Sequence, residues 1–364
     1  HKDEVYKKNM NKFRDYIKTN ITNAEYTPKK TIATTSEALD RYLELTDDRV
    51  LSTYQGLMTY EKVLTAFVSR LLQANSDCPY IRSDYNAVVS SGRTSCYSSA
   101  NYPSVNIQQM PRSLEGVTWD IRNCFIPREG FIMVAIDFGN LELAATANQL
   151  YKVYGTSAMR DIINSGNKPV DMHSILACRI KSLQDNVFCS YEQFVAHKKE
   201  DVYKALRQLA KPINLGFPGG IGYDTMRGLL LREGIKTDFK VLYVHKKEDV
   251  VVDKFKELHR RGLANMSHIR IARLGQFRYA IVLDDLVNLK REHFKLYPEL
   301  DTFLRESNED YMTGKTRNMQ NEYGEWETEE MYSYVTNNIH RDWCTYTALC
   351  NGFLMQTPAA AGFK

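Results

Sequence analysis

The sequence predicts a mixed fold in which helices dominate and at least one strand is buried. Apolar residues recur at helical spacing in four parts of the chain: 37–75, 198–217, 285–304 and 328–351. Residues 131–136 form a continuous apolar run of strand length, which predicts a buried strand that delivers Asp137 at its tip. With 364 residues, the chain is long enough for roughly two or three domains, or for one domain with subdomains.

Each segment has its own signals. We expect two helices within 37–75, with Thr35 or Ser36 as the N-cap, because these hydroxyls can accept from the first backbone N–H groups. Segment 78–112 is rich in Ser, Asn, Tyr and Pro, which favours loops and short strands. Residues 141–151 return to helical spacing, and Pro218, Gly219 and Gly220 end the basic helix 198–217. The polar stretch 306–327 predicts a surface loop, whereas 232–280 has no clear periodicity.

Composition excludes some classes of protein. Hydrophobic residues make up 43% and charged residues 25%, close to the averages for soluble proteins, and no window approaches the ~18 apolar residues of a membrane span. We therefore expect neither a membrane protein nor a disordered chain. The net charge of +4 is too small to identify a polyanionic partner, so any basic surface must be local.

Cysteine and histidine spacing predicts neither disulfides nor histidine-bound metal. The seven cysteines contain no CxxC pair, and the eight histidines contain no HxxxH pair. A reduced, intracellular setting is therefore favoured. The first ten residues, HKDEVYKKNM, are charged and lack the apolar core of a secretory signal, so we expect the sequence to be a fragment of a longer protein.

Two groups of residues are candidates for chemistry. Arg207, Lys211, Leu215 and Gly219 are each four apart, so a helix places them along one face at intervals of about 6 Å, where two cations can clamp a phosphate chain. The alternative is an ordinary solvated basic face, but the apolar run 213–217 argues against it. Asp137 either binds a hard cation such as Mg²⁺ or caps a helix, and its residue type alone favours neither.

Five segments of the chain follow one another in a recognisable order. They are Ser91-Gly92-Arg93 followed by Asn106-Ile107-Gln108-Gln109-Met110-Pro111, which count as one, then Asp137-Phe138-Gly139-Asn140-Leu141-Glu142-Leu143 (motif A), Asp171-Met172-His173, Arg207-x3-Lys211-Pro212-Ile213-Asn214-Leu215-Gly216 (motif B), and Met355-Gln356-Thr357-Pro358-Ala359-Ala360. Any one of these is weak, but together and in this order they resemble the family A DNA polymerases, the bacterial DNA polymerase I type.

The resemblance implies an α+β right-hand polymerase fold, mostly helical with a palm β-sheet. It places a partial thumb at 1–75, the first part of the palm at 76–160, the fingers at 161–300 and a truncated second part of the palm at 301–364. The implied function is template-directed DNA synthesis from deoxynucleoside triphosphates (dNTPs) on primer–template DNA, with two Mg²⁺ ions and Mn²⁺ as the alternative. Phosphoryl transfer needs cations at the oxygens that gain charge and little covalent chemistry from the protein.

The family roles transfer by position. By resemblance, Asp137 and the Phe138 carbonyl bind metal, Glu142 is a steric gate against the ribose 2′-OH, and Lys211 also protonates pyrophosphate. The implied dNTP contacts are Arg207, Lys211, His173, Glu142 and Leu215. The implied DNA contacts are Arg93 and Gln356 in the minor groove, Asn106 and Gln108 near the backbone, and Gly219 at the template base.

The chain departs from the family at several positions. Leu215 and Gly219 replace aromatic residues, and Pro212 lies inside the helix, where it removes a hydrogen bond and should cause a kink. The loop after Arg93 is longer than usual, and Asn351 is one residue too far from Gln356 for a simple match.

The family's second metal carboxylate is also missing. It belongs to a His-Asp-Glu motif that is absent from these 364 residues, so we expect a missing tail or a second polypeptide to supply it. Asp284 and Asp285 follow the apolar residues 279–283, but an N-cap role is favoured there.

Two other functions compete with DNA synthesis. A single-subunit phage RNA polymerase shares the right-hand plan, but Glu142 occupies the space that a ribonucleotide needs. A non-catalytic primer–template-binding subunit fits the missing motif, but Asp137, Arg207 and Lys211 favour an enzyme. The expected location is the cytoplasm of a bacterial or phage-infected host cell, with an organelle as the alternative and no membrane partner.

Overall fold

Helices dominate the computed structural model, which gives 56% helix and 17% strand. The strands form small antiparallel sheets, so the mixed composition agrees with the predicted α+β class. The structure describes residues 9–363, except for residues 23, 28, 74–79, 88, 90, 98–101, 103, 112–119, 167–169, 236–238, 264–268, 275–276 and 321–325. None of the helices in these described ranges combines the length and apolar character needed to cross a bilayer.

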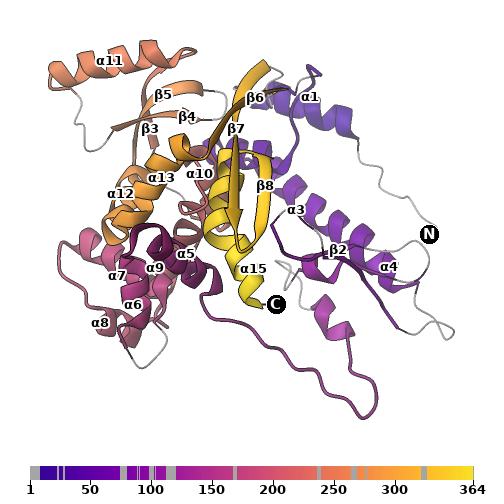
Figure 1. The fold of residues 1–364 in the computed structure, drawn as a ribbon. Coiled ribbons are helices and arrows are strands. Elements are labelled where there is room, and N and C mark those ends of the chain that lie inside the picture. Colours follow the sequence, from indigo (N-terminus) through magenta and orange to yellow (C-terminus); the bar gives the residue numbers. More distant parts are fainter. Residues whose placement is uncertain are drawn as a thin grey trace. The chain divides into compact units, whose positions relative to one another are not determined.

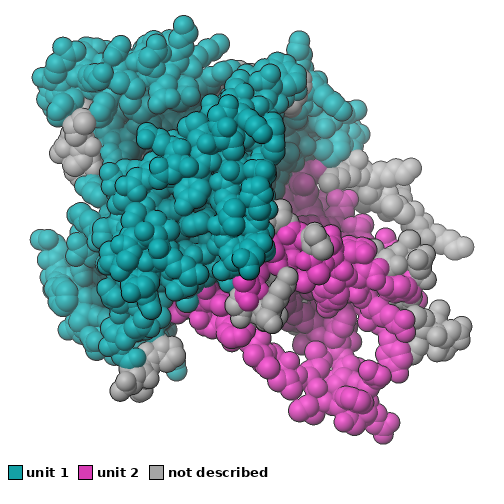
Figure 2. Space-filling view, viewed as in Figure 1, with its two compact units in different colours: residues 1–47, 142–358 teal, residues 48–141, 359–364 magenta. Residues whose placement is uncertain are grey.

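The chain divides into two compact units, coloured separately in Figure 2. Unit 1 consists of residues 1–47 and 142–358, and unit 2 of residues 48–141 and 359–364. This division follows other boundaries than the four parts expected from the resemblance, which stay a prediction. Most of the helices and both three-stranded sheets lie in unit 1 (Figure 1).

Among the residues described, unit 1 contains eleven α-helices before residue 311. They are α1 Met10–Asn20, α2 Ser36–Leu45, α5 Leu141–Tyr154, α6 Ala158–Asn164, α7 Met172–Asp185, α8 Tyr191–His197, α9 Asp201–Gly216, α10 Tyr223–Arg232, α11 Glu248–Arg260 and α12 Asp285–Leu296, followed by α13 Pro298–Asp310. Thr35 caps α2 by accepting from the N–H of Ala38 at 3.3 Å, as its hydroxyl predicts.

The basic helix α9 packs along α7 through an apolar stripe (Figure 1). Leu206, Ala210, Ile213 and Phe217 are spaced three or four residues apart and are buried, so they share one face of α9. They join Leu176, Phe194 and Met226 in one core cluster. The helix predicted over 198–217 is therefore confirmed, and its basic side chains lie on the face away from this core.

A small sheet occupies the segment that the sequence left unassigned. Strands β3 Phe239–His245, β5 Phe277–Asp284 and β4 Ile269–Leu274 pair antiparallel in the order β3-β5-β4. Helix α11 packs on this sheet, where Val251 meets Ile269 and Ile281. Both edge strands are short and interrupted by register shifts, which explains the weak periodicity.

The second sheet corrects two expectations. Strands β6 Met312–Gln320, β7 Trp326–Thr336 and β8 Ile339–Cys344 stand where much of the loop predicted at 306–327 and most of the helix predicted at 328–351 were expected. Residues 306–310 of that loop belong to α13, and 321–325 lie outside the described residues. On β7, Tyr332, Tyr334 and Thr336 are buried at alternate positions, a period of two. Asn337 and Asn338 both have positive φ angles, 47° and 61°, which suits the tight turn between β7 and β8.

The last helical part of the chain includes a π-helical turn. It consists of α14 Tyr346–Cys350, the π-helix η4 Asn351–Gln356 and α15 Thr357–Phe363. Gly352 lies so close to Tyr334 that a Cβ atom would stand 1.8 Å from the phenolic oxygen, so any larger residue would displace β7 or η4. The side chains of η4 and α14 share a core with α5 and α13 through Leu354, Leu150 and Phe303.

Unit 2 contains the second helix expected within 37–75, together with short elements. These are α3 Arg49–Val63, the π-helix η1 Leu64–Val68, α4 Ser69–Leu71, β1 Asp84–Asn86, β2 Ser95–Tyr97 and the 3₁₀ turns η2 Ile107–Gln109 and η3 Ile121–Cys124. Val63, Phe67, Val105 and Met110 form its core. The loops and short strands predicted over 78–112 are thus found in the part of that segment that is described.

The strand predicted at 131–136 is wrong. These residues form neither helix nor strand, and Ile132 and Ile136 are each 85% exposed. A strand needs a neighbour for its N–H and C=O groups, and no described residue pairs with this segment. An apolar run alone therefore does not form a strand here.

Candidate functional site

The N-terminus of α7 lies beside α9 and carries the first site residue. Asp171 is the N-cap of α7, where its carboxylate accepts from the N–H of His173 at 3.2 Å and from the hydroxyl of Ser174 at 2.9 Å. Its own N–H donates to the hydroxyl of Tyr191 at 3.0 Å. Two hydrogen bonds to the carboxylate and one from the backbone N–H therefore hold Asp171 at the start of α7.

Arg207 of α9 binds the same carboxylate. Its Nε donates to Oδ2 of Asp171 at 2.6 Å, which holds the guanidinium against the start of α7. Burial acts to raise the pKa of Asp171, but the hydrogen bonds from Arg207 and Ser174 outweigh it and hold the pKa below its usual value. Asp171 is therefore ionised at neutral pH and positions Arg207 as a fixed cation.

The tautomer of His173 follows from its neighbour Asn214. The Asn214 side-chain nitrogen Nδ2 donates to the carbonyl of Met172 at 3.0 Å, which fixes the amide orientation, because a carbonyl only accepts. The same nitrogen lies 3.2 Å from Nδ1 of His173, so Nδ1 accepts. Nε2 of the neutral ring then carries the proton and is a hydrogen-bond donor.

Electrostatics keep His173 neutral and leave Lys211 available. Burial lowers the pKa of His173; the Asp171 carboxylate opposes this shift, whereas Arg207 and Lys211 add to it. The His173 imidazole therefore experiences the positive charge of both Arg207 and Lys211. Lys211 is exposed and forms no ion pair with a described residue.

We call Asp171, His173, Arg207, Lys211 and Asn214 the α7–α9 cluster. It presents a positioned guanidinium, an ammonium group without a carboxylate partner among the described residues, and an imidazole N–H. The one carboxylate offsets one of the two cations, so a positive charge remains. Such a set of donors binds an anion, and phosphate oxygens suit both the guanidinium and the ammonium.

Three other site candidates lie farther along this part of unit 1. Leu215 is half-buried and packs against the core cluster of α5 and α13. The carbonyl of Gly219 accepts from Asn351 at 3.5 Å, and a Cβ atom at Gly219 would lie 2.6 Å from the Asn351 side chain, so a larger residue there would move that side chain. Gln356 is half-buried at the end of η4.

The motif A candidates fall in different units. Asp137 and Phe138 belong to unit 2, where both are exposed in the extended segment before α5. Glu142 belongs to unit 1 and lies in the first turn of α5, as predicted. The described residues contain no group of three His, Cys, Asp or Glu side chains arranged to hold a metal ion. Asp137 alone, among the described residues, does not make an Mg²⁺ or Mn²⁺ site.

The remaining DNA-contact candidates gather in unit 2. Gln108 donates from Nε2 to the hydroxyl of Thr94 at 3.1 Å, which brings η2 next to Arg93. Asn106 caps η2 by accepting from the N–H of Gln109 at 3.2 Å. Arg93 is exposed beside Gly92, whose positive φ of 76° makes the turn. The structure thus brings Arg93, Asn106 and Gln108 together.

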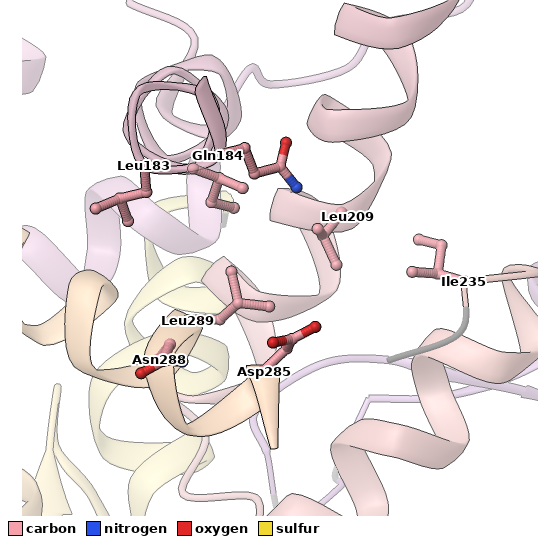
Figure 3. Close-up of a pocket in the computed structure, with 8 residues that line it drawn as sticks. Leu183, Gln184, Leu209, Ile235, Asp285, Asn288 and Leu289 are labelled. Atoms are coloured by element: carbon pink, nitrogen blue, oxygen red, sulfur yellow. The ribbon is translucent and has the colours of Figure 1, made fainter. Parts of the chain in front are cut away.

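Asp285 lies away from the α7–α9 cluster, in a cavity of about 290 Å³ (Figure 3). Ile180, Leu183 and Gln184 of α7, Leu209 of α9 and residues of α12 line it. Leu209 is two residues from both Arg207 and Lys211, which places it on the opposite face of α9. Asp285 begins α12, in keeping with the expected helix-capping position rather than with a place among the cations.

The motif resemblance assigns no ligand contact to Asp171 or Asn214, although both position other residues of the α7–α9 cluster. Both occur within the motif segments, and an Asp directly before a helical run is a typical N-cap. That signal predicts the cap. The bond from Asp171 to Arg207 joins residues 36 apart, which no local pattern predicts. No family model matches the chain, and no curated protein is significantly similar to it.

Proposed function

We propose that the α7–α9 cluster binds the triphosphate of an incoming dNTP, and that this chain belongs to a template-directed DNA polymerase. One observation carries the proposal. Arg207, Lys211 and His173, which the motif resemblance assigns to the triphosphate, come from two separate segments and interact electrostatically at one place.

The cluster suits a phosphate chain in detail. Arg207 can keep its bond to Asp171 through Nε and still present its terminal nitrogens to a phosphate oxygen. Lys211, one turn farther along α9, adds a mobile ammonium, and the Nε2–H of His173 adds a neutral donor. Charge that develops on the phosphates during nucleotidyl transfer would be stabilised by these groups.

Nucleotide binding by the chain tests the proposal. The dissociation constant for dATP, measured by isothermal titration calorimetry, should rise at least ~10-fold in Lys211→Ala and in Arg207→Ala, because each loses a charge-assisted contact. Lys152→Ala is the matched control, since Lys152 is an exposed lysine in the last turn of α5. Equal affinity in all four proteins would refute the assignment.

An experiment with primer–template DNA distinguishes DNA synthesis from DNA binding alone. In the proposed polymerase, extension of a primer by one complementary dNTP should require Lys211, whereas a non-catalytic subunit would bind the duplex without extending it. A wild type that prefers ribonucleotides would favour the RNA polymerase alternative.

A further inference from the structure

A second cationic site lies outside the α7–α9 cluster. Strand β4 and helices α10, α12 and α13 surround a cavity of about 520 Å³ in unit 1. Its volume falls within the ~300–1,000 Å³ of small-molecule sites. The residues that line it include five cations and one carboxylate: Arg270, Lys290, Arg291, Lys295, Arg305 and Asp301.

Three of the cations have polar partners. Lys295 pairs with Glu292 at 2.7 Å, and Arg305 lies 3.4 Å from Asp301. Arg291 donates to the side chain of Asn288. These bonds account for part of the positive charge and for the only carboxylate among the lining residues.

Lys290 and Arg270 lack this compensation. Neither forms an ion pair with a residue in the described ranges, and the one printed bond of Arg270 is to the carbonyl of Ile269 at 3.1 Å. Lys290 instead lies over the rings of Tyr223 at 4.9 Å and Phe217 at 5.2 Å, and near a third ring, Phe294. Aromatic faces attract a cation without neutralising it.

The two cations oppose each other. Burial lowers the pKa of Lys290, and the charge of Arg270 lowers it further, with only Asp301 acting in the other direction. A bound anion would therefore stabilise the charged form of Lys290, which lies among aromatic rings and experiences the positive charge of Arg270. A hydrated surface lysine would show neither feature.

We propose that this cavity binds a phosphate group, held between Arg270 and Lys290, of a nucleotide-sized ligand or of a nucleic-acid strand. The guanidinium can donate two parallel hydrogen bonds to phosphate oxygens, while the ammonium acts as a point charge. The site goes beyond the proposed function and does not rest on it, because it uses none of the residues of the α7–α9 cluster.

The test uses the full chain with Arg207→Ala and Lys211→Ala as the background, so that the other site does not contribute. Inorganic tripolyphosphate, ATP and an unphosphorylated dT12 oligonucleotide are titrated at low salt. Adding Arg270→Ala and Lys290→Met should weaken binding at least ~10-fold, while Lys256→Ala on the exposed face of α11 should not. Methionine retains the unbranched apolar stem that packs against the rings.

The probes separate the two sources of phosphate. Loss for tripolyphosphate and ATP alone identifies a small ligand, and loss for dT12 alone identifies a strand. Unchanged affinity for every probe, or no binding by any probe at millimolar concentration, would overturn the proposal. A second measurement needs no variant: saturating tripolyphosphate should slow acetylation of Lys290 several-fold and leave Lys256 unaffected, as mapped by mass spectrometry. Equal protection of both lysines, or of neither, would contradict the site.

Discussion

Arg207 and Asp171 are 36 residues apart in sequence, and their side chains meet at 2.6 Å. The bond joins the middle of α9 to the first turn of α7. Asp171 thereby caps one helix and orients a cation on the other. Since Arg207 has a fixed partner, Lys211 is the cation of the α7–α9 cluster that can follow a ligand.

The pH dependence of stability should report the Asp171 carboxylate. Its pKa is lowered in the folded state, so its ionised form contributes stability that is full above the unfolded-state pKa of about 4 and is lost as the pH falls through the folded-state pKa. Asp171→Asn keeps a capping side chain but removes the charge. We expect it to be less stable by ~1 kcal/mol at pH 7, and we expect this difference to shrink as the pH is lowered below about 4, measured by urea unfolding. Asp185→Asn, in an exposed pair with Lys181, should show almost no difference.

His293 should make the protein sensitive to mild acid. The ring is fully buried, both nitrogens lack a described partner, and burial together with Lys290 lowers the pKa to about 3. The neutral form therefore contributes stability above about pH 6.5 that is lost as the pH falls towards 3, roughly 2 kcal/mol by pH 5. His293→Leu should remove that loss, seen as urea midpoints that change less between pH 8 and pH 5. His340→Gln is the control, because His340 is exposed. If the urea midpoint of His293→Leu changed with pH as much as that of the wild type, the assignment to His293 would be contradicted.

In the proposed polymerase, Lys211→Ala should lower kcat/KM for the nucleotide by ~10²-fold or more. The reason is that a positioned charge would be lost where negative charge develops. Single-turnover extension measures the effect. A solvated lysine, represented by Lys152→Ala, should change kcat/KM by less than twofold.

Asp137→Asn should abolish primer extension by the proposed polymerase and leave primer–template affinity within a few-fold. The motif resemblance assigns this carboxylate to the reaction, and one exposed acidic side chain contributes little to binding of a polyanion. Extension and a DNA titration on the same variant measure both properties. Retained extension would remove Asp137 from the reaction centre.

Glu142→Ala should raise incorporation of ribonucleotides relative to deoxyribonucleotides, because a shorter side chain opens space at the 2′ position. The ratio of the two values of kcat/KM is the measurement. An unchanged ratio would show that the first turn of α5 does not form the gate.

The helices with strong apolar periodicity were predictable from sequence. In α9, Leu206, Ala210 and Ile213 bury one stripe against α7, so the pattern and the packing coincide. The run 131–136 fails for the opposite reason. Its burial depends on a neighbouring strand, and local composition does not say whether one exists.

The second sheet shows another limit. In β7, Met331 and Tyr332 are both buried, which interrupts the simple alternation of a strand and mimics helical spacing.

The α7–α9 cluster was predictable from the sequence only in part. The spacing of Arg207 and Lys211 predicts one basic face, while the bond to Asp171 depends on tertiary packing.

The π-helical turn η4 sets the direction of Gln356 relative to Asn351. Asn351 and Gln356 are five apart, and a π-helix has roughly 4.4 residues per turn, so five residues advance about as far around the axis as four do in an α-helix. The side chains of Asn351 and Gln356 therefore leave the helix in nearly the same direction although they are five residues apart. Deleting a single residue between them should restore ordinary helical winding and leave Gln356 on the same side, so length variation at this point need not disturb the direction of the glutamine.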